Sequence, residues 1–503
     1  TSISHIPLIY ITMQEGVQFA AATNLKSRNK QGNGTAAESP SLSPQISDHS
    51  NDAGNKSNNH YKERLSPFRY KLRSLILPLI RQETIYLAKM QSFLRCSVFD
   101  FYFAWTANLA SHTFYVLMLP PPIWFGGSYL TRDLVYVLGL GIYLTGFLKD
   151  FFCLPRPRSP PLHRITMSSY TTQEYGFPSS HLANATGVSL LLLIKILSLE
   201  NVSNTTYYSL IVGLSLYYIS LIFGRLYCGM HGFLDIIIGG LVGLFVFLFR
   251  HYFGLQWDKL LFDNGLGLVA STVIIIAVFV LLIHFHSEPV DDCPCFDDSV
   301  AFVGVLIGLD LAHLVAYQTK YFAKMNLTGN PYLIPFDVNR GVLNSVSRFL
   351  LGVALVVTWK TLAKPIVFTI LPPIYKAVGV YLPRRSYIST AHTQTSTRKI
   401  RSTSMSNDSN MGIGDINNFI KGVTDHNKKD EVGPETEIDY YEMLSYSQNQ
   451  NSDNTTIQTP PKYNSGVFKY RYDVEIVGRL IIYAGISITA VWTFAFASDY
   501  LNL

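Results

Sequence analysis

The stretch FGRLYCGMHGFLDIIIGGLVGLFVFLF, residues 223–249, places Arg225, His231 and Asp235 directly before a long apolar run. An apolar run of about 20 residues is long enough to cross a bilayer as a helix. Charged side chains are costly at a membrane border, so their presence there indicates a functional site. The stretch therefore predicts an all-α membrane protein with a polar site at one end of its helices.

Two kinds of sequence alternate in the 503-residue chain, which is 48% hydrophobic. Residues 24–64 and 384–467 are rich in Ser, Thr, Asn, Gln and Lys, and they have little apolar surface to bury. The remainder is strongly apolar. The formal net charge of +6 is small and dispersed, which argues against nucleic-acid binding. We expect a protein whose partner is the lipid bilayer, with no nucleic-acid partner.

Apolar segments of membrane-spanning length recur along the chain. The candidates are residues 98–119, 133–153, 182–199, 207–224, 233–254, 267–286, 299–317, 342–360, 364–381 and 477–498. Because WKTLAKP (359–365) interrupts the pair at 342–381, these residues form either two spans or one broken helix. We predict a polytopic helical bundle of eight to ten transmembrane helices. No internal repeat is evident, which counts against transporter folds built from duplicated halves.

Three polar islands lie at the ends of predicted spans. They are KDFFCLPRPRSPPLHR (149–164), YGFPSSHLANATG (175–187) and the opening stretch. The span at 133–153 ends at one membrane face, 182–199 begins at that face, and 207–224 returns to it. Topology alone therefore brings the three islands together on one side of the membrane.

The islands contain the groups expected of a phosphate pocket. Lys149, Arg156 and Arg225 supply three cations, and guanidinium groups match phosphate oxygens with two parallel hydrogen bonds. Ser179 and Ser180 precede an apolar helix, where backbone N–H groups and hydroxyls can point at an anion. Taken singly, basic residues at span ends are usually membrane anchors, and a Ser before a helix is usually a cap.

Two histidines add a reaction to the pocket. His231 and Asp235 are four residues apart at the start of a helix, so the carboxylate can hold one ring nitrogen protonated and leave the other as a nucleophile. His181 could protonate the leaving oxygen and later activate water. Together the groups predict phosphoryl transfer through a phosphohistidine. No carboxylate cluster suited to Mg²⁺ accompanies them, so we expect neither a metal nor another cofactor.

The same residues match a family pattern. They resemble the three-part signature of the lipid phosphate phosphatase superfamily, also called the type 2 phosphatidate phosphatase and haloperoxidase-like group. The first part is Lys149, six residues and Arg156–Pro157, and the second is Pro178–Ser179–x–His181. The third is Arg225, five residues, His231, three residues and Asp235. The resemblance implies His231 as nucleophile, Asp235 as its partner and His181 at the leaving group. It assigns Lys149, Arg156, Ser179 and Arg225 to phosphate.

This sequence departs from the family signature at two positions. Ser180 stands in place of the common Gly of PSGH, and Gly224 replaces the common Ser of the Ser–Arg pair. Neither change removes a catalytic group, since Ser180 still presents its backbone N–H. We therefore expect an active enzyme.

A narrower likeness covers about half the chain. Segments such as SHTFYVLMLPPPIWFG, CLPRPRSPPLHRIT, CPCFDDSVAF and GRLIIYAGI resemble the fungal sphingoid long-chain base-1-phosphate phosphatases. This resemblance implies hydrolysis of dihydrosphingosine- and phytosphingosine-1-phosphate in the endoplasmic reticulum membrane, with a lumenal active site. A broader phosphatase of phosphatidate or diacylglycerol pyrophosphate is the alternative, and a lipid transporter or scramblase is a weaker one.

The chain divides into six expected regions. They are a largely disordered N-terminal region (1–64), an interfacial amphipathic helix (65–96), the catalytic membrane core (97–254), additional membrane helices (255–383), a disordered tail segment (384–467) and a C-terminal membrane helix (468–503). Residues 68–95 alternate basic and apolar groups at helical spacing, which suits a helix lying against lipid head groups. A soluble amphipathic helix that packs on the protein fits the same pattern.

Three further features leave alternatives open. The basic residues at 64–95 fall on the same side as the motifs when two spans precede the pocket, so the positive-inside rule argues for a cytosolic pocket. Cys293 and Cys295 could form a bridge or supply half of a metal site. Asp310 and His313 lie inside a predicted span, where we expect them to pair with each other across one helical turn.

Overall fold

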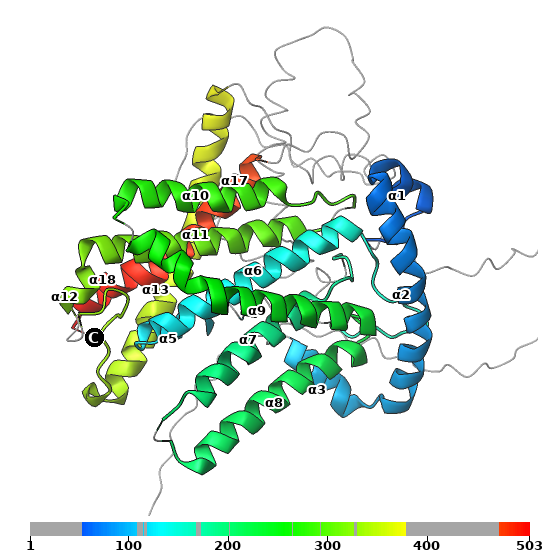
Figure 1. The fold of residues 1–503 in the computed structure, drawn as a ribbon, viewed down its shortest axis with the longest axis horizontal. Coiled ribbons are helices and arrows are strands. Elements are labelled where there is room, and N and C mark those ends of the chain that lie inside the picture. The colour runs from blue at the N-terminus through cyan, green and yellow to red at the C-terminus, as the bar shows by residue number, and fades with distance from the viewer. Residues whose placement is uncertain are drawn as a thin grey trace, which may run out of the picture. The chain divides into compact units, whose positions relative to one another are not determined.

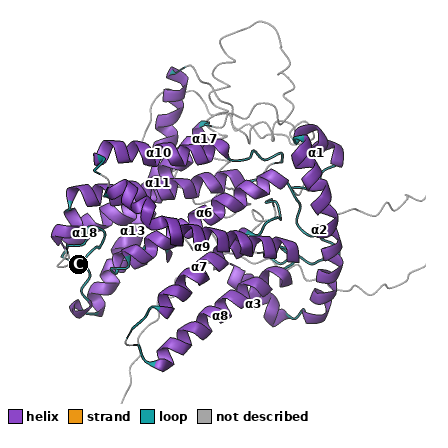
Figure 2. Ribbon diagram, viewed as in Figure 1, coloured by secondary structure: helices purple, strands orange, loops and turns teal. Residues whose placement is uncertain are grey.

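The computed structural model describes residues 53–107, 114, 118–166, 173–200, 202–263, 265–291, 293–325, 329–378 and 472–502. Across these residues the secondary structure is helical and contains no strand (Figures 1 and 2). The predicted disordered segment 384–467 lies outside the described residues, as do residues 1–52 of the predicted N-terminal region.

Within the described residues, eight helical segments are long and apolar enough to cross a membrane, and they make the chain a multi-pass membrane protein. They are α6 (Ser128–Phe152), α7 (Ser180–Leu197), α8 (Asn204–Tyr227), α9 (Phe233–Phe262), α10 (Gly267–Phe285), α11 (Cys295–Thr319), α13 (Val342–Ala377) and the C-terminal run of α17 (Val474–Ile488), η6 (Thr489–Thr493) and α18 (Phe494–Tyr500). This number confirms the predicted all-α bundle of eight to ten spans. Of the two candidate spans at 342–381, the described residues Val342–Ala377 form one helix, α13, which continues through Pro365.

The first predicted span, residues 98–119, is described only in part. It begins as α3 (Ser97–Ala107), which packs on α8, and the next described helix is the short α5 (Pro121–Trp124). Three further short helices, α1 (Asn58–Arg64), α12 (Tyr321–Met325) and η4 (Val338–Arg340), connect or precede the longer ones.

Helix α11 forms the centre of the main hydrophobic core, between α6 and α17. Its side chains Val300, Leu306 and Leu314 are fully buried. Gly304 and Gly308 face α17, and a Cβ at Gly308 would overlap the backbone of Ala484. The four-residue spacing of these glycines therefore permits close packing of α11 against α17.

Helix α2 (Pro67–Leu94) runs across the ends of α6 and α9 (Figure 1). Arg69 donates to the carbonyl oxygens of Asp150 (2.5 Å) and Phe151 (2.9 Å), and so caps the C-terminal end of α6. One face of α2 is buried at Arg73, Ile80, Thr84, Leu87 and Gln91, and the other exposes Phe68, Leu75, Leu79, Tyr86 and Phe93. The helix thus packs on the protein and also presents an apolar face, so its contact with lipid remains a prediction.

The structure departs from two expectations. Residues 53–64 are ordered, because α1 buries Tyr61, whose hydroxyl donates to Asp291 at 2.6 Å. Asp310 and His313 do not form the expected pair. Each instead contacts Arg132 of α6, at 2.8 Å and 3.1 Å, because the guanidinium of that neighbouring helix supplies the charge that a buried carboxylate needs.

Candidate functional site

The three polar islands meet at one end of the bundle, where α6 and α8 end and α7 and α9 begin. Lys149 lies in the last turn of α6, and Arg156 follows in the loop after it. Ser179 is the N-cap of α7, accepting a hydrogen bond from the Leu182 N–H at 3.4 Å. His231 lies in the short connection between α8 and α9. The structure thus gathers residues that are up to 82 positions apart in the chain, from Lys149 to His231.

The expected phosphate-binding cations are buried in this cluster. Lys149, Arg156 and Arg225 are 3%, 3% and 6% exposed. The Lys149 Nζ lies 3.4 Å from the Ser180 hydroxyl, and Arg156 Nη1 lies 3.3 Å from His231 Nε2. Three buried cations in one site favour an anionic ligand, because buried positive charges need negative charge close by.

His231 is held through its Nδ1 atom. This nitrogen lies 3.0 Å from the carbonyl oxygen of Gly176 and 3.6 Å from Asp235 Oδ2. Because a carbonyl can only accept, Nδ1 carries the proton and Nε2 keeps a lone pair directed toward Arg156. Burial, reinforced by the positive charge of Arg156, holds the pKa of His231 well below its usual range. The ring is therefore neutral, and its Nε2 atom can act as a nucleophile.

The carbonyl of Gly176 was missed by sequence reasoning, which gave the whole orienting role to Asp235. Sequence motifs describe side chains, and a backbone acceptor from another island leaves no signal of its own. Asp235 instead contributes chiefly to the start of α9, where its Oδ2 accepts from the Gly232 N–H at 2.8 Å. Its charge still lies beside the His231 ring.

The second histidine faces the first across the site. The ring centroids of His181 and His231 are 6.4 Å apart, with their planes inclined by 53°. His231 is 1% exposed, whereas His181 and Ser180 are half-buried. The two rings are close enough to contact one bound anion from two sides.

Glycines of α9 set the distance between these two helix ends. Gly239 and Gly243 face the backbone of α7, and a Cβ at Gly239 would lie 2.5 Å from the carbonyl oxygen of Ser179. The Ser179 N–H also donates to the carbonyl of Asp235 at 3.0 Å. Close helix packing at these glycines thus ties the start of α7 to the start of α9.

The two residues that depart from the family signature, Ser180 and Gly224, each lie against a specific neighbour. Ser180 extends its hydroxyl toward Lys149. At Gly224, a Cβ would lie 2.9 Å from the Phe103 ring of α3, so a serine there would collide with this neighbour. The glycine therefore allows α3 to pack on α8.

Two glutamates at the site were not singled out from the sequence. Glu174 places Oε2 2.5 Å from Lys149 Nζ and 3.5 Å from Arg156 Nη2. Glu83 of α2 accepts from the Leu234 N–H at 3.0 Å at the start of α9, and burial raises its pKa. Glu174 lies between two islands, but no spacing rule would have assigned it to these cations.

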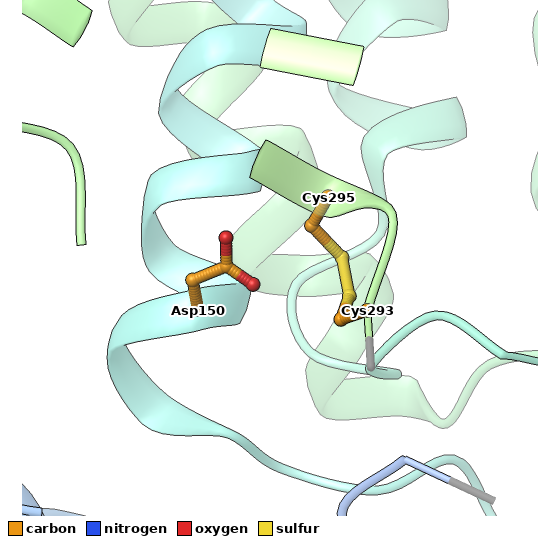
Figure 3. Close-up of side chains that lie close together, drawn as sticks. All are labelled: Asp150, Cys293 and Cys295. Atoms are coloured by element: carbon orange, nitrogen blue, oxygen red, sulfur yellow. A yellow bond between two sulfur atoms is a disulfide. The ribbon is translucent and has the colours of Figure 1, made fainter. Parts of the chain in front are cut away.

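Cys293 and Cys295 form a disulfide, the first of the two alternatives (Figure 3). Figure 3 shows the Asp150 carboxylate of α6 pointing toward this bridge. The three residues are buried and close enough to share a metal ion, but bridged sulfurs are poor ligands because metals bind the thiolate. The bridge and its carboxylate lie outside the set of predicted phosphate contacts.

Comparison with known proteins gives consistent results. The sequence model of the PAP2 superfamily matches residues 130–259, which contain all eight predicted site residues. A dihydrosphingosine 1-phosphate phosphatase of Schizosaccharomyces pombe is 34% identical over 423 residues, covering 83% of this chain and 88% of that protein. A second one, from Saccharomyces cerevisiae, is 39% identical over 321 residues, covering 64% and 76%.

A more distant relative is sphingosine-1-phosphate phosphatase 2 of Homo sapiens, which is 26% identical over 301 residues and covers 58% of this chain and 71% of that protein. No solved structure matches the chain.

Proposed function

The chain belongs to the PAP2 superfamily and, within it, to the family of the fungal dihydrosphingosine 1-phosphate phosphatases, and from this premise we propose that it hydrolyses sphingoid base 1-phosphates. The products are the free base and inorganic phosphate. The observation that carries the proposal is the pair of histidine rings, 6.4 Å apart, inside a group of three buried cations.

The first step forms a phosphohistidine. His231 Nε2 attacks phosphorus in line with the ester oxygen, the N–P bond forms, and the P–O bond to the lipid breaks. His181 donates its proton to the departing alkoxide, which leaves as the alcohol of the sphingoid base. As His231 becomes positively charged, the Gly176 carbonyl and the Asp235 carboxylate stabilise its Nδ1–H.

The second step returns the enzyme to its starting state. His181, now neutral, removes a proton from a water molecule, and the resulting nucleophile attacks phosphorus. The N–P bond breaks, and its electron pair returns to His231 Nε2. The phosphate oxygens face Lys149, Arg156 and Arg225 throughout, so these cations stabilise the charge of both transition states.

These residues perform both steps with no metal and no other cofactor. In other phosphoryl transfers, Mg²⁺ binds the phosphoryl oxygens and neutralises their charge. Here we assign both tasks to cationic side chains.

We further place the enzyme in the endoplasmic reticulum membrane with its site on the lumenal face. The Cys293–Cys295 bridge supports this orientation, because it lies between α10 and α11 at the same end as the site, and disulfides persist in the oxidising lumen. The basic residues of α2 oppose it under the positive-inside rule. Arg69 and Arg73, however, are engaged by backbone carbonyls, so part of this charge serves the fold.

The test is phosphate release from dihydrosphingosine 1-phosphate by the full chain in EDTA-treated membranes. We expect His231→Ala to abolish release, because no other group takes over the attack. His251→Ala, an exposed histidine of α9, is the matched control and should retain activity. Release that persists in His231→Ala would refute the mechanism, and faster turnover of phosphatidate by the wild type would favour the broader lipid phosphatase.

A further inference from the structure

The carboxylate of Glu174 forms ion pairs with two of the cations that should bind the substrate phosphate, Lys149 and Arg156. Its Oε2 is 2.5 Å from Lys149 Nζ and 3.5 Å from Arg156 Nη2, and its backbone oxygen accepts from Arg156 Nε at 3.2 Å. The residue is 8% exposed. An anion of the protein therefore holds the place where the mechanism needs an anion of the substrate.

Binding of a phosphate monoester must disturb these pairs. Two anions that share the same cations repel each other, and a buried carboxylate that gives up two cations loses the charge compensation that those cations supplied. For a ligand that carries only negative charge, nothing in the ligand offsets the free energy of separating Glu174 from these cations. A ligand that also brings a cation close to its phosphate can neutralise the displaced carboxylate.

Sphingoid base 1-phosphates have this chemistry. Their amino group, an ammonium at neutral pH, is on the carbon adjacent to the phosphorylated one. Phosphatidate and N-acylated sphingoid phosphates carry the phosphate without the ammonium. Among these lipids, only the free base phosphate can therefore give its phosphate to the cations and its ammonium to the displaced Glu174 carboxylate.

Two other carboxylates near the site accept hydrogen bonds from backbone N–H groups. Glu83 accepts from Leu234, and Asp235 accepts from Gly232, so both stabilise the start of α9. Glu174 differs because its carboxylate contacts the cations Lys149 and Arg156, which are the expected phosphate-binding groups.

We propose that Glu174 determines substrate specificity: the substrate's phosphate takes over Lys149 and Arg156, and the released Glu174 carboxylate binds the adjacent ammonium. This inference rests on the proposed function and identifies how that site selects its lipid. Selection operates in both directions, because the same carboxylate attracts the free base and penalises a phosphate that lacks an amine.

The test compares two substrates that differ only in the amine. Dihydrosphingosine 1-phosphate and its N-acetyl derivative are given to the full-length wild type and to Glu174→Gln in detergent micelles. We expect the wild type to prefer the free amine, and the variant to lose about 10- to 100-fold of that preference in kcat/KM. Glu200→Gln, at an exposed position outside the site, is the control and should keep the wild-type ratio.

Two further measurements do not depend on turnover of both substrates. Orthovanadate, an anion without an amine, should inhibit Glu174→Gln more strongly than wild type, because the competing carboxylate is gone. Thermal stabilisation by non-hydrolysable phosphonate analogues, with and without the free amine, should repeat the loss of preference. If Glu174→Gln does not fold, Glu174→Asp gives the same comparison with a shorter carboxylate and a smaller loss.

The outcomes separate this inference from the proposed function. An unchanged preference in the folded Glu174 variant overturns the inference, whether or not vanadate binds more tightly, while hydrolysis that needs His231 still supports the function. If the wild type releases no phosphate from dihydrosphingosine 1-phosphate, the proposed function fails first and the inference fails with it.

Discussion

Replacing Gly239 by alanine should separate the two catalytic histidines without touching either of them. The new Cβ would lie 2.5 Å from the carbonyl oxygen of Ser179, and ordinary contact begins near 3.4 Å. The start of α7 must therefore move away from α9 by about 0.9 Å. Ser179 caps α7 and bonds to the Asp235 carbonyl, so this movement displaces the phosphate-binding end of α7 and His181.

The expected effects can be estimated from general magnitudes. A misplacement of about 1 Å in an active site can reduce the rate about 100-fold. Overpacking lowers the free energy of unfolding by about 1–3 kcal/mol, and the better helix propensity of alanine offsets up to about 1 kcal/mol of this loss. We therefore expect a large loss of kcat/KM with a modest loss of thermal stability, measured on one detergent-purified preparation.

Gly240→Ala provides a matched control one position away. A Cβ there meets only Thr186 Oγ1 at 3.7 Å and Leu182 Cδ2 at 3.9 Å, which are ordinary contacts. This variant should be as active as wild type and equally or more stable. If Gly239→Ala is as active as Gly240→Ala, the close approach of α7 and α9 does not position the site, and the reasoning is wrong.

Three other predictions follow from the site and its surroundings. Because the pKa of His231 is held well below its usual range, the ring stays neutral as pH falls through 6.5, so a pH profile of kcat/KM corrected for substrate ionisation should show no acid limb from it there. Saturating EDTA should change phosphate release by less than about twofold, and loss of activity that Mg²⁺ restores would contradict the metal-free mechanism. Asp291→Asn should weaken docking of the segment around Tyr61 by about 2–3 kcal/mol, detected as faster proteolysis there. Although burial alone would raise the pKa of Asp291, hydrogen bonds from Tyr61 and Gly54 hold it below its ordinary value. That stabilisation should persist at neutral pH and be lost on acidification.

The gathering of the site could be predicted because it follows from counting spans. Each polar island adjoins the end of an apolar run, so alternation across the bilayer decides which islands share a face. The contacts of α9 with α7 and of α11 with α17 are made at glycines four residues apart, a spacing that permits close approach but does not specify the partner helix.

The remaining features depend on partners that sequence spacing does not encode. Asp310 and His313 are placed to pair within their helix, yet Arg132 from α6 contacts both. Gly176 orients His231 through a backbone oxygen, which any residue could supply. Glu174 reaches Lys149 only because the loop before α7 folds back on the end of α6. These contacts arise from tertiary packing.

The central claim is that His231 attacks phosphorus in a pocket built by the three islands. Rapid acid-free quenching of the enzyme with radiolabelled dihydrosphingosine 1-phosphate, followed by peptide mapping, tests this directly. The account predicts an acid-labile, alkali-stable phosphoryl group on the peptide that contains His231, and no label in His231→Ala. A label on another residue, or full turnover with water attacking the substrate directly, would contradict it.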